Sequence, residues 1–466
     1  MDERLYSRPL DVHRISEYPE VQRMITYLFD EMKASGLIGK SPRKKVLKHL
    51  KVVVLDLYVA YLHDPLVYLG YSRSPRDYSG NTRLGQLFLG YRPTIRVVDG
   101  LLDLGYLEHH KGFQDLASGR SFLSRMRNTP KLIDLIENYS VTPTMIALED
   151  DQLIILRDAD KEDIDYEETD ETSAMEATLQ SYNAFLSQYE LALSLPTEKV
   201  RDFLQSRRIA PIDYTRNRLY RIFNEDFTSG GRFYRGWWQN IPRELRQYIT
   251  IEGEPCSELD YSGQHLLLLY GLEGDEYRWL KGLNDDPYYL EDYGEDVRSL
   301  LKVAVLILVN ETNEDRAIRA IRQKINYDFP YLDSTDDYIK SLIEALKNKH
   351  PEIKDQLFSG KGGALQYQDS QIAEYVLKDM KARGQPVLPV HDSFIVQDKY
   401  MAHLYSSMKE AYRMLGVDSI PEVKIKKGAN TTYDKPYFMQ LWELMDAESK
   451  INQKELESIK KLEDLL

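Results

Sequence analysis

Hydrophobic residues in the first third of the chain recur at helical spacing and then change to short alternating runs. The spacing predicts an amphipathic helix at residues 21–34 and a longer helix from Lys44 through "KKVLKHLKVVVLDLYVAYLHDP". A third helix is expected from Pro93, because proline is favoured in the first turn of a helix. Residues 105–108 then read as a short strand, and "KGFQDLASGRSFLSRMR" reads as a turn and a second strand rich in Ser and Arg.

This order of helices followed by a basic hairpin resembles a winged helix-turn-helix, which is a DNA-binding module. The resemblance implies that residues 1–148 form a winged-helix-like domain that contacts DNA. The alternative is a small helical domain that only packs against the rest of the chain.

The middle of the chain is strongly acidic. Residues 149–176 carry 13 acidic and 2 basic side chains, a net charge of −11, which is most of the formal charge of −14. The flanking segments 41–130 and 199–250 have net charges of +7 and +6. We therefore expect two cationic surfaces joined by a solvated acidic linker at 149–176, with one strand in "DQLIILRDAD".

Beyond the linker, helical and strand-like patterns mix from residue 177 to 440, and a polar helix is expected at 441–466. The fold class is therefore α+β, and 466 residues suffice for two or three domains. No stretch approaches the ~20 apolar residues that span a bilayer. The single cysteine, Cys256, excludes an internal disulfide framework and a cysteine-based zinc site. With an N-terminus too polar for a secretory signal, these features predict a cytoplasmic protein without membrane contact.

Candidate chemistry begins in "GGRFYRGWWQNIPRELRQYITIEGEPCSELDYSGQHL", residues 230–266. Two glycines before Arg232 let its cationic side chain approach a backbone or a phosphate closely. Gln239 and Asn240 can donate to and accept from base or sugar edges. Arg243 and Arg246 follow three residues apart, on one side of a helical turn.

Two acids then stand at the ends of predicted strands. Asp260 ends the strand-like run before an apolar stretch, and "VLPVHDSFIVQ" places Asp392 between two β-rich runs. Two Mg²⁺ ions about 4 Å apart stabilise both oxygens of an in-line phosphoryl displacement, and Mg²⁺ needs only one or two protein carboxylates besides substrate phosphates. Two acids that the fold brought together would therefore suffice as ligands of two Mg²⁺ ions, with Mn²⁺ as a substitute. Arg298 and Lys302 follow four residues apart on one face of a predicted helix, and two such cations can neutralise phosphate charge.

The order Gly-Arg, Gln-Asn-Ile-Pro, paired arginines and Asp-Tyr-Ser resembles the core of family A DNA polymerases, the bacterial polymerase I kind. The resemblance implies a right-hand core at 177–440, with an antiparallel palm sheet, helical fingers and a reduced thumb. It makes Asp260 and Asp392 the catalytic metal ligands, and Tyr261, the next residue of the motif, is assigned to the same metal site. Arg298 and Lys302 would bind the nucleotide. The primer–template side would comprise Arg232, Gln239, Asn240, Arg243, Arg246 and His391.

Some residues resemble the phage-type single-subunit RNA polymerases instead, which share the fold. His-Asp-Ser at 391–393 replaces the usual His-Asp-Glu of polymerase I enzymes, and Gln368-Asp369 also has the RNA polymerase form. Val309-Asn310 departs from the aromatic-Gly pair of both families. Counting from Asp260 puts His265 at the sugar-discriminating position of the nucleotide site, whereas the RNA polymerase alignment needs a gap there.

The sequence thus predicts a template-directed nucleotidyltransferase, with a family A DNA polymerase lacking a 3′–5′ exonuclease domain favoured. Its partners would be primer–template or single-stranded DNA and nucleoside triphosphates. One alternative is a phage-type RNA polymerase or primase-like enzyme. The other is a catalytically inactive DNA-binding replication protein.

Overall fold

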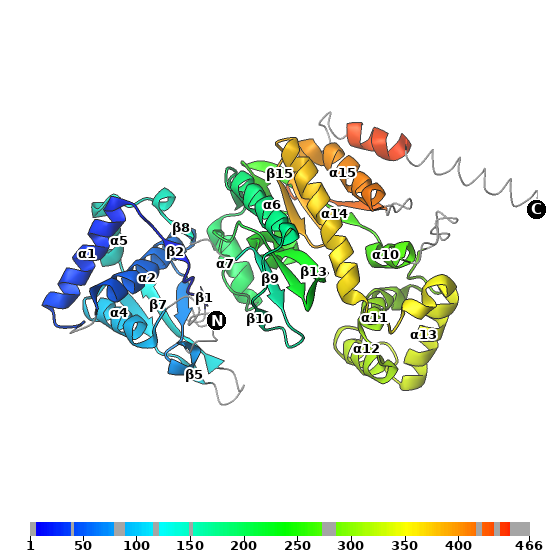
Figure 1. The fold of residues 1–466 in the computed structure, drawn as a ribbon, viewed down its shortest axis with the longest axis horizontal. Coiled ribbons are helices and arrows are strands. Elements are labelled where there is room, and N and C mark those ends of the chain that lie inside the picture. Colours follow the sequence, from blue (N-terminus) through cyan, green and yellow to red (C-terminus); the bar gives the residue numbers. More distant parts are fainter. Residues whose placement is uncertain are drawn as a thin grey trace, which may run out of the picture. The chain divides into compact units, whose positions relative to one another are not determined.

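The structure is a computed structural model that describes residues 6–38, 42–78, 89–114, 121–148, 152–272, 286–415, 422–432 and 439–447 (Figure 1). It is a mixed α+β fold whose contacts divide the chain into two compact units. The first unit contains Met1–Gln152 and Leu195–Thr215, and the second contains Leu153–Ser194 and Arg216–Leu466. No helix within the described residues is both long enough and apolar enough to cross a membrane.

In the first unit, helices surround a four-stranded sheet of order β1-β3-β7-β4, in which β1 pairs with β3 in parallel and the other pairs are antiparallel. The helices expected from residues 21, 44 and 93 are confirmed, as is the strand after the third helix. The assignment of this unit as a winged-helix domain stays a prediction. The elements are α1 (Pro19–Ala34), α2 (Arg43–His63), α4 (Tyr91–Asp103), α5 (Pro130–Asn138), α7 (Thr197–Ser206), β1 (Ser7–Pro9), β2 (Arg14–Ile15), β3 (Tyr68–Tyr71), β4 (Leu107–His110), β5 (Phe113–Gln114), β6 (Ser121–Phe122), β7 (Ser124–Asn128) and β8 (Ala147–Leu148), with short 3₁₀ turns at Pro75–Tyr78 and Pro143–Met145.

A buried ion cluster fastens the later segment of this unit to its N-terminal strands. Asp56 is fully buried; it accepts hydrogen bonds from Arg8 (2.8 and 2.9 Å) and from Nε of Arg14 (3.0 Å). Asp213 completes the cluster at 3.5 Å from Arg14. Although burial raises the pKa of Asp213, Arg8 and Arg14 hold it below its ordinary value. Residues 195–215 are therefore bound to the first unit by paired charges.

This cluster generates a stability prediction. Asp56→Asn leaves two buried guanidinium groups short of their main counter-charge, so we expect a loss of about 3–5 kcal/mol of unfolding free energy. Urea unfolding followed by circular dichroism measures it. Glu20→Gln is the control, because Glu20 meets an Arg23 that is 61% exposed, and a solvent-exposed pair of this kind contributes little to stability. A loss for Asp56→Asn no larger than for Glu20→Gln would contradict the role of the cluster.

The second unit is built on a six-stranded sheet of order β11-β14-β15-β17-β16, with β18 also paired to β15, and all of its pairs are antiparallel. Two long helices, α14 and α15, run together beside this sheet (Figure 1). The bounds are β11 (Leu191–Leu193), β14 (Ile249–Ile251), β15 (Glu254–Tyr261), β16 (Val387–Val390), β17 (Ser393–Gln397), β18 (Val423–Lys426), α14 (Gly362–Ala382) and α15 (Met401–Met414), with a 3₁₀ turn at Asp398–Tyr400.

A second sheet, of order β10-β9-β12-β13, differs from the predicted linker. β9 (Ile154–Arg157) buries Ile154 and Leu156 and pairs in parallel with β12 (Tyr220–Asn224). After β10 (Asp163–Ile164), Thr169 caps α6 (Asp170–Leu186), whose first turn carries two acids where the helix dipole favours negative charge. Most of 149–176 is thus folded structure, because its few apolar residues complete a sheet and its last acids start a helix. The remaining strand is β13 (Asp226–Tyr234).

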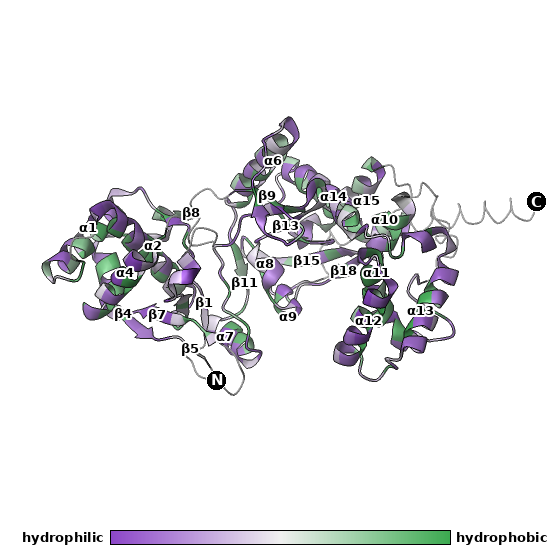
Figure 2. Cartoon of the chain, turned by 60° about the horizontal axis from the view of Figure 1, so that its bottom comes forward, coloured by the Kyte–Doolittle hydropathy of each residue, from purple (hydrophilic) through white to green (hydrophobic). Residues whose placement is uncertain are grey.

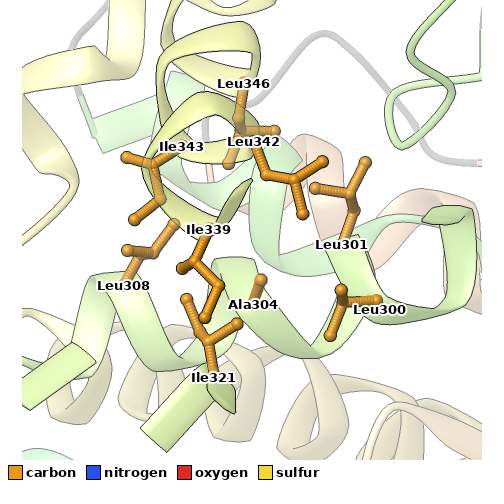
Figure 3. A pocket seen from close by; sticks show the side chains of 9 residues that line it. All are labelled: Leu300, Leu301, Ala304, Leu308, Ile321, Ile339, Leu342, Ile343 and Leu346. Carbon is orange, nitrogen blue, oxygen red and sulfur yellow. The ribbon is translucent and has the colours of Figure 1, made fainter. Parts of the chain in front are cut away.

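A helical part of this unit positions one further helix, α11 (Arg298–Asn310). Its apolar face packs against α12 (Glu314–Asp328) and α13 (Asp336–Lys349). Both of these helices are amphipathic, with polar and apolar residues on different faces (Figure 2). Nine aliphatic side chains converge there and leave a void of only about 10 Å³ between them (Figure 3). The apolar face of α11 is therefore packed against its neighbours, while Arg298 at its N-terminus makes a polar contact with Asp286.

The remaining short elements of the second unit are α8 (Trp237–Asn240), α9 (Arg243–Arg246), α10 (Gln264–Leu272) and 3₁₀ turns at Glu295–Val297 and Pro351–Gln356. Residues 439–447 are helical, in agreement with part of the predicted C-terminal helix. Residues 448–466 lie outside the described residues.

Candidate active site

Strand pairing brings the two predicted acids together. β15 runs antiparallel to β17 with Asp260 opposite Ser393, and Asp392 is the residue directly before Ser393 in the turn from β16. The main-chain N–H of Tyr261 donates to the carbonyl of Asp392 over 3.4 Å. Residues 132 positions apart in sequence are thus neighbours at one edge of the sheet.

The electrostatics of Asp392 reflect this closeness. Burial, together with the negative charges of Asp369 and Asp260, raises the pKa of Asp392 to about 7. Among the described residues no ion pair to Asp392 is found. Its nearby charges are mainly other carboxylates, which repel the ionised form of Asp392. A carboxyl in such surroundings favours either a proton or an added cation.

Lys426 supplies a cation to the other acid. Its Nζ lies 2.8 Å from Oδ2 of Asp260 and 2.8 Å from Oε1 of Glu258, two residues earlier on the same face of β15. Although burial lowers the pKa of Lys426, hydrogen bonds to Asp260 and Glu258 raise it above its ordinary value. The ammonium therefore stays charged and bridges the two carboxylates.

α11 presents the predicted nucleotide-binding cations to this edge. Arg298, its first residue, forms an ion pair with Asp286, and Lys302 lies one turn later with its ammonium 5.6 Å from the ring centre of Tyr288. Burial and the charges of Arg298 and Lys424 lower the pKa of Lys302, while Asp286 and Asp260 oppose that shift. The lysine is therefore within electrostatic reach of Asp260.

Arg232 is held by an acid that sequence reasoning did not assign to the site. Its Nε donates to Oδ2 of the buried Asp369 over 2.5 Å, and its Nη2 lies 3.1 Å from Nε2 of His265. Gln264 donates to the other oxygen of Asp369 over 3.0 Å. The Gln-Asp pair at 368–369 was the sequence signal that could have pointed to Asp369. The sequence gives no indication, however, that a buried acid within this helix pairs with Arg232.

The glycines before Arg232 lie at an irregularity of the β12–β13 pairing. Gly230 and Gly231 have φ values of +83° and +75°, and the β12–β13 register shifts beside them. A Cβ on Gly231 would lie 2.6 Å from the ring of Phe223. The pair therefore forms a bulge that directs Arg232 toward Asp369, and close approach of Arg232 to a phosphate stays a prediction.

Two other predicted contacts are used within the fold. The side chain of Gln239 donates to the carbonyls of Phe233 and Pro389 and accepts from the N–H of Gly236, so it holds the turn together. Asn240 is exposed but donates back to the carbonyl of Gly236 over 3.3 Å. Both amides thus have backbone partners, and their expected contact with base edges stays a prediction.

The paired arginines face a polar cavity of about 270 Å³. Arg243 is exposed at its edge, and Nε of Arg246 lies 3.7 Å from Oε2 of Glu258. Lys426 lines the same cavity, so the arginines adjoin the acidic edge of the sheet.

Tyr261 and His391 flank the acids. The phenol of Tyr261 is buried and donates to the carbonyl of Met408 over 2.6 Å, so its assignment to the metal site can apply only to its main-chain carbonyl. His391 adopts φ +57°, and its ring centre lies 6.0 Å from that of Tyr234. The histidine therefore braces the turn that carries Asp392.

Asp260 and Asp392 are the candidate metal ligands of this site. Among the described residues, no group of three or more His, Cys, Asp or Glu side chains is placed to hold a metal ion. Asp260 and Asp392 nevertheless offer hard oxygen donors, and the ammonium on Asp260 shows that the position already binds a cation. Mg²⁺ needs one or two protein carboxylates when phosphates and waters complete its shell, so the pair fits an ion shared with a substrate.

No protein-family model and no curated protein matches the chain. A search of solved structures finds similarity to the POL domain of Pol1 from M. smegmatis, solved in complex with a DNA primer-template and dNTP. The match has 11% sequence identity and a TM-score of 0.33, and it covers 90% of this chain and 66% of that chain, just under two thirds.

The raised pKa of Asp392 generates a second prediction. Between its ordinary value of 3.8 and about 7 the folded chain holds this proton while the unfolded chain releases it, so stability falls as pH rises through that window. Asp392→Asn removes the effect, and we expect it to stabilise the metal-free protein by about 1–3 kcal/mol at pH 8 and by little at pH 4. Urea unfolding in EDTA, followed by tryptophan fluorescence, is suitable because the first unit contains no tryptophan.

Asp260→Asn is the matched control for this prediction. Asp260 is paired with Lys426, so its loss should leave stability unchanged or lower at both pH values. Equal effects of the two substitutions at pH 8 would contradict the different surroundings assigned to the two carboxyls.

Proposed function

We propose that the chain catalyses template-directed nucleotidyl transfer with two divalent ions, as a DNA polymerase of the family A type. One observation carries the proposal: the β15–β17 register, which makes Asp260 and Asp392 neighbours at a partly open sheet edge. Lys302 of α11, which is within electrostatic reach of Asp260, supports it further.

Each group has a defined task in this reaction. Asp260 and Asp392 would hold the ions through carboxylate oxygens, with the carbonyl of Tyr261 as a further oxygen donor. Bound Mg²⁺ supplies charge stabilisation at the attacking and leaving oxygens. Arg298 and Lys302 neutralise the triphosphate, and Arg243 with Arg246 meets phosphates of the primer–template. His265 stands beside Arg232, where a bulky ring would limit the sugar of the incoming nucleotide.

Primer extension tests the two acids directly. Asp260→Asn and Asp392→Asn keep the side-chain shape but remove the charge that holds the ions, so we expect each to lower the extension rate by about 10²–10⁴-fold. Glu254→Gln, an exposed acid at the start of the same strand, is the control and should leave the rate unchanged. Normal extension by either acid variant would refute the proposal.

Lys302 tests the nucleotide side. Lys302→Met retains the aliphatic length but loses a charge-assisted contact to phosphate, so we expect KM for the nucleotide to rise about 10–100-fold. Lys324→Met, on α12 and paired with Asp328, controls for loss of charge elsewhere. Steady-state kinetics with varied nucleotide measures both, and an unchanged KM for Lys302→Met would remove this residue from the triphosphate site.

The same assays separate the alternatives. Synthesis from ribonucleotides on an unprimed template would favour a phage-type RNA polymerase or a primase-like enzyme. An inactive DNA-binding protein is the candidate that the Asp260–Lys426 pair favours, since that ion pair could persist as a purely structural contact. Duplex binding without any metal-dependent incorporation would support it.

A further inference from the structure

The bridging position of Lys426 has a consequence for the proposed metal site. β18 pairs with β15 so that Lys426 is opposite Glu258, and the side chain reaches along the strand to Asp260. Its Nζ is 2.8 Å from an oxygen of each carboxylate, while Asp260 remains 25% exposed and Lys426 29% exposed. The ammonium thus occupies one oxygen of the residue proposed as the first metal ligand.

We propose that Lys426 is a positioning residue that stands in for the divalent ion at Asp260, and that metal binding displaces it onto Glu258. The inference rests on the proposed function, because it takes Asp260 to be a metal ligand. It assigns to Lys426 and Glu258 a role that the polymerase-like motifs do not include.

Repulsion between cations requires the exchange. A divalent ion bound to the Asp260 carboxylate would lie within about 5 Å of an ammonium at hydrogen-bond distance from the same group, and the like charges repel strongly in a partly buried setting. Lys426 therefore competes with the ion for Asp260. Without metal, the same ammonium keeps the Asp260 carboxylate oriented and its charge balanced.

Glu258 is built to hold the displaced ammonium. It is 7% exposed, accepts a hydrogen bond from Ser393 over 2.8 Å, and meets Arg246 at 3.7 Å through its other oxygen. Lys426 and Glu258 both line the 270 Å³ cavity, so the lysine has room to withdraw on that side. Because Glu258 is fixed beside this cavity, the ammonium of Lys426 can leave Asp260 and still keep Glu258 as its partner.

The test measures Mn²⁺ affinity of the full chain by electron paramagnetic resonance, without DNA or nucleotide. Lys426→Met should tighten Mn²⁺ binding at least about 10-fold, because the competing cation is gone. Lys426→Arg keeps the charge and should bind Mn²⁺ close to wild type. Lys424→Met is the matched control; this neighbour on β18 is 49% exposed and lies 3.8 Å from Glu422, so its loss should change affinity less than about 3-fold.

The outcomes separate this inference from the proposed function. Mn²⁺ binding that depends on Asp260 and Asp392 but is not tightened by Lys426→Met beyond Lys424→Met would overturn the inference alone. Mn²⁺ binding that is unaffected by Asp260→Asn and Asp392→Asn would overturn both. Mn²⁺ binding that is absent from wild type and Lys426→Met alike would overturn the inference alone, because the proposed function takes its ions together with the nucleotide. Tightening that disappears when Lys426→Met is combined with Asp260→Asn would confirm that the lysine acts through Asp260.

Discussion

The antiparallel register of β15 is the constraint on which the rest of the second unit depends. Pairing with β17 puts Asp260 opposite Ser393 and therefore next to Asp392, while pairing with β18 puts Lys426 opposite Glu258. A slip of one residue would turn Asp260 into the core and Tyr261 out of it, because side chains alternate between faces. The buried phenol of Tyr261, bonded to the carbonyl of Met408, opposes that slip. The same packing that stabilises the sheet thus fixes the chemistry at its edge.

Charge balance then decides how each acid behaves. Asp369 has Arg232, and Glu258 and Asp260 share Lys426, so each of these carboxylates lies beside a cation. Asp392 is buried and lies near other carboxylates, and both effects raise its pKa to about 7. Two acids of the same type, at neighbouring positions on one sheet edge, therefore differ in their need for a cation. The difference comes from what lies opposite them, which no local motif specifies.

The strand-end positions of Asp260 and Asp392 and the helix α11 were predicted because each leaves a short-range sequence pattern. An acid at the end of an apolar strand and a basic pair four residues apart can be read without knowing the fold. Asp369 and Lys426 could not be found this way, since their partners are 137 and 168 positions away. The acidic segment at 149–176 was misread for a related reason: net charge hid Ile154 and Leu156, which complete a sheet, and Thr169, which caps a helix. The bulge at Gly230 and Gly231, which directs Arg232, could not be predicted either, because only the pairing with β12 reveals it.

The proposed site is also satisfied internally before any ligand arrives. Arg298 has Asp286, Lys302 has the ring of Tyr288, and Asp260 has Lys426. Ligand binding is therefore an exchange of partners, and its free energy is the difference between two sets of charge contacts. A polyanion without metal would have to take the cations of α11 from their present partners, and the carboxylates would repel it. A divalent ion without nucleotide would have to displace Lys426 from Asp260. A nucleotide that arrives with its divalent ions replaces both sets together, because each charge it displaces is matched by one it brings. Under the proposed function, selectivity for the metal-bound triphosphate follows from this joint exchange.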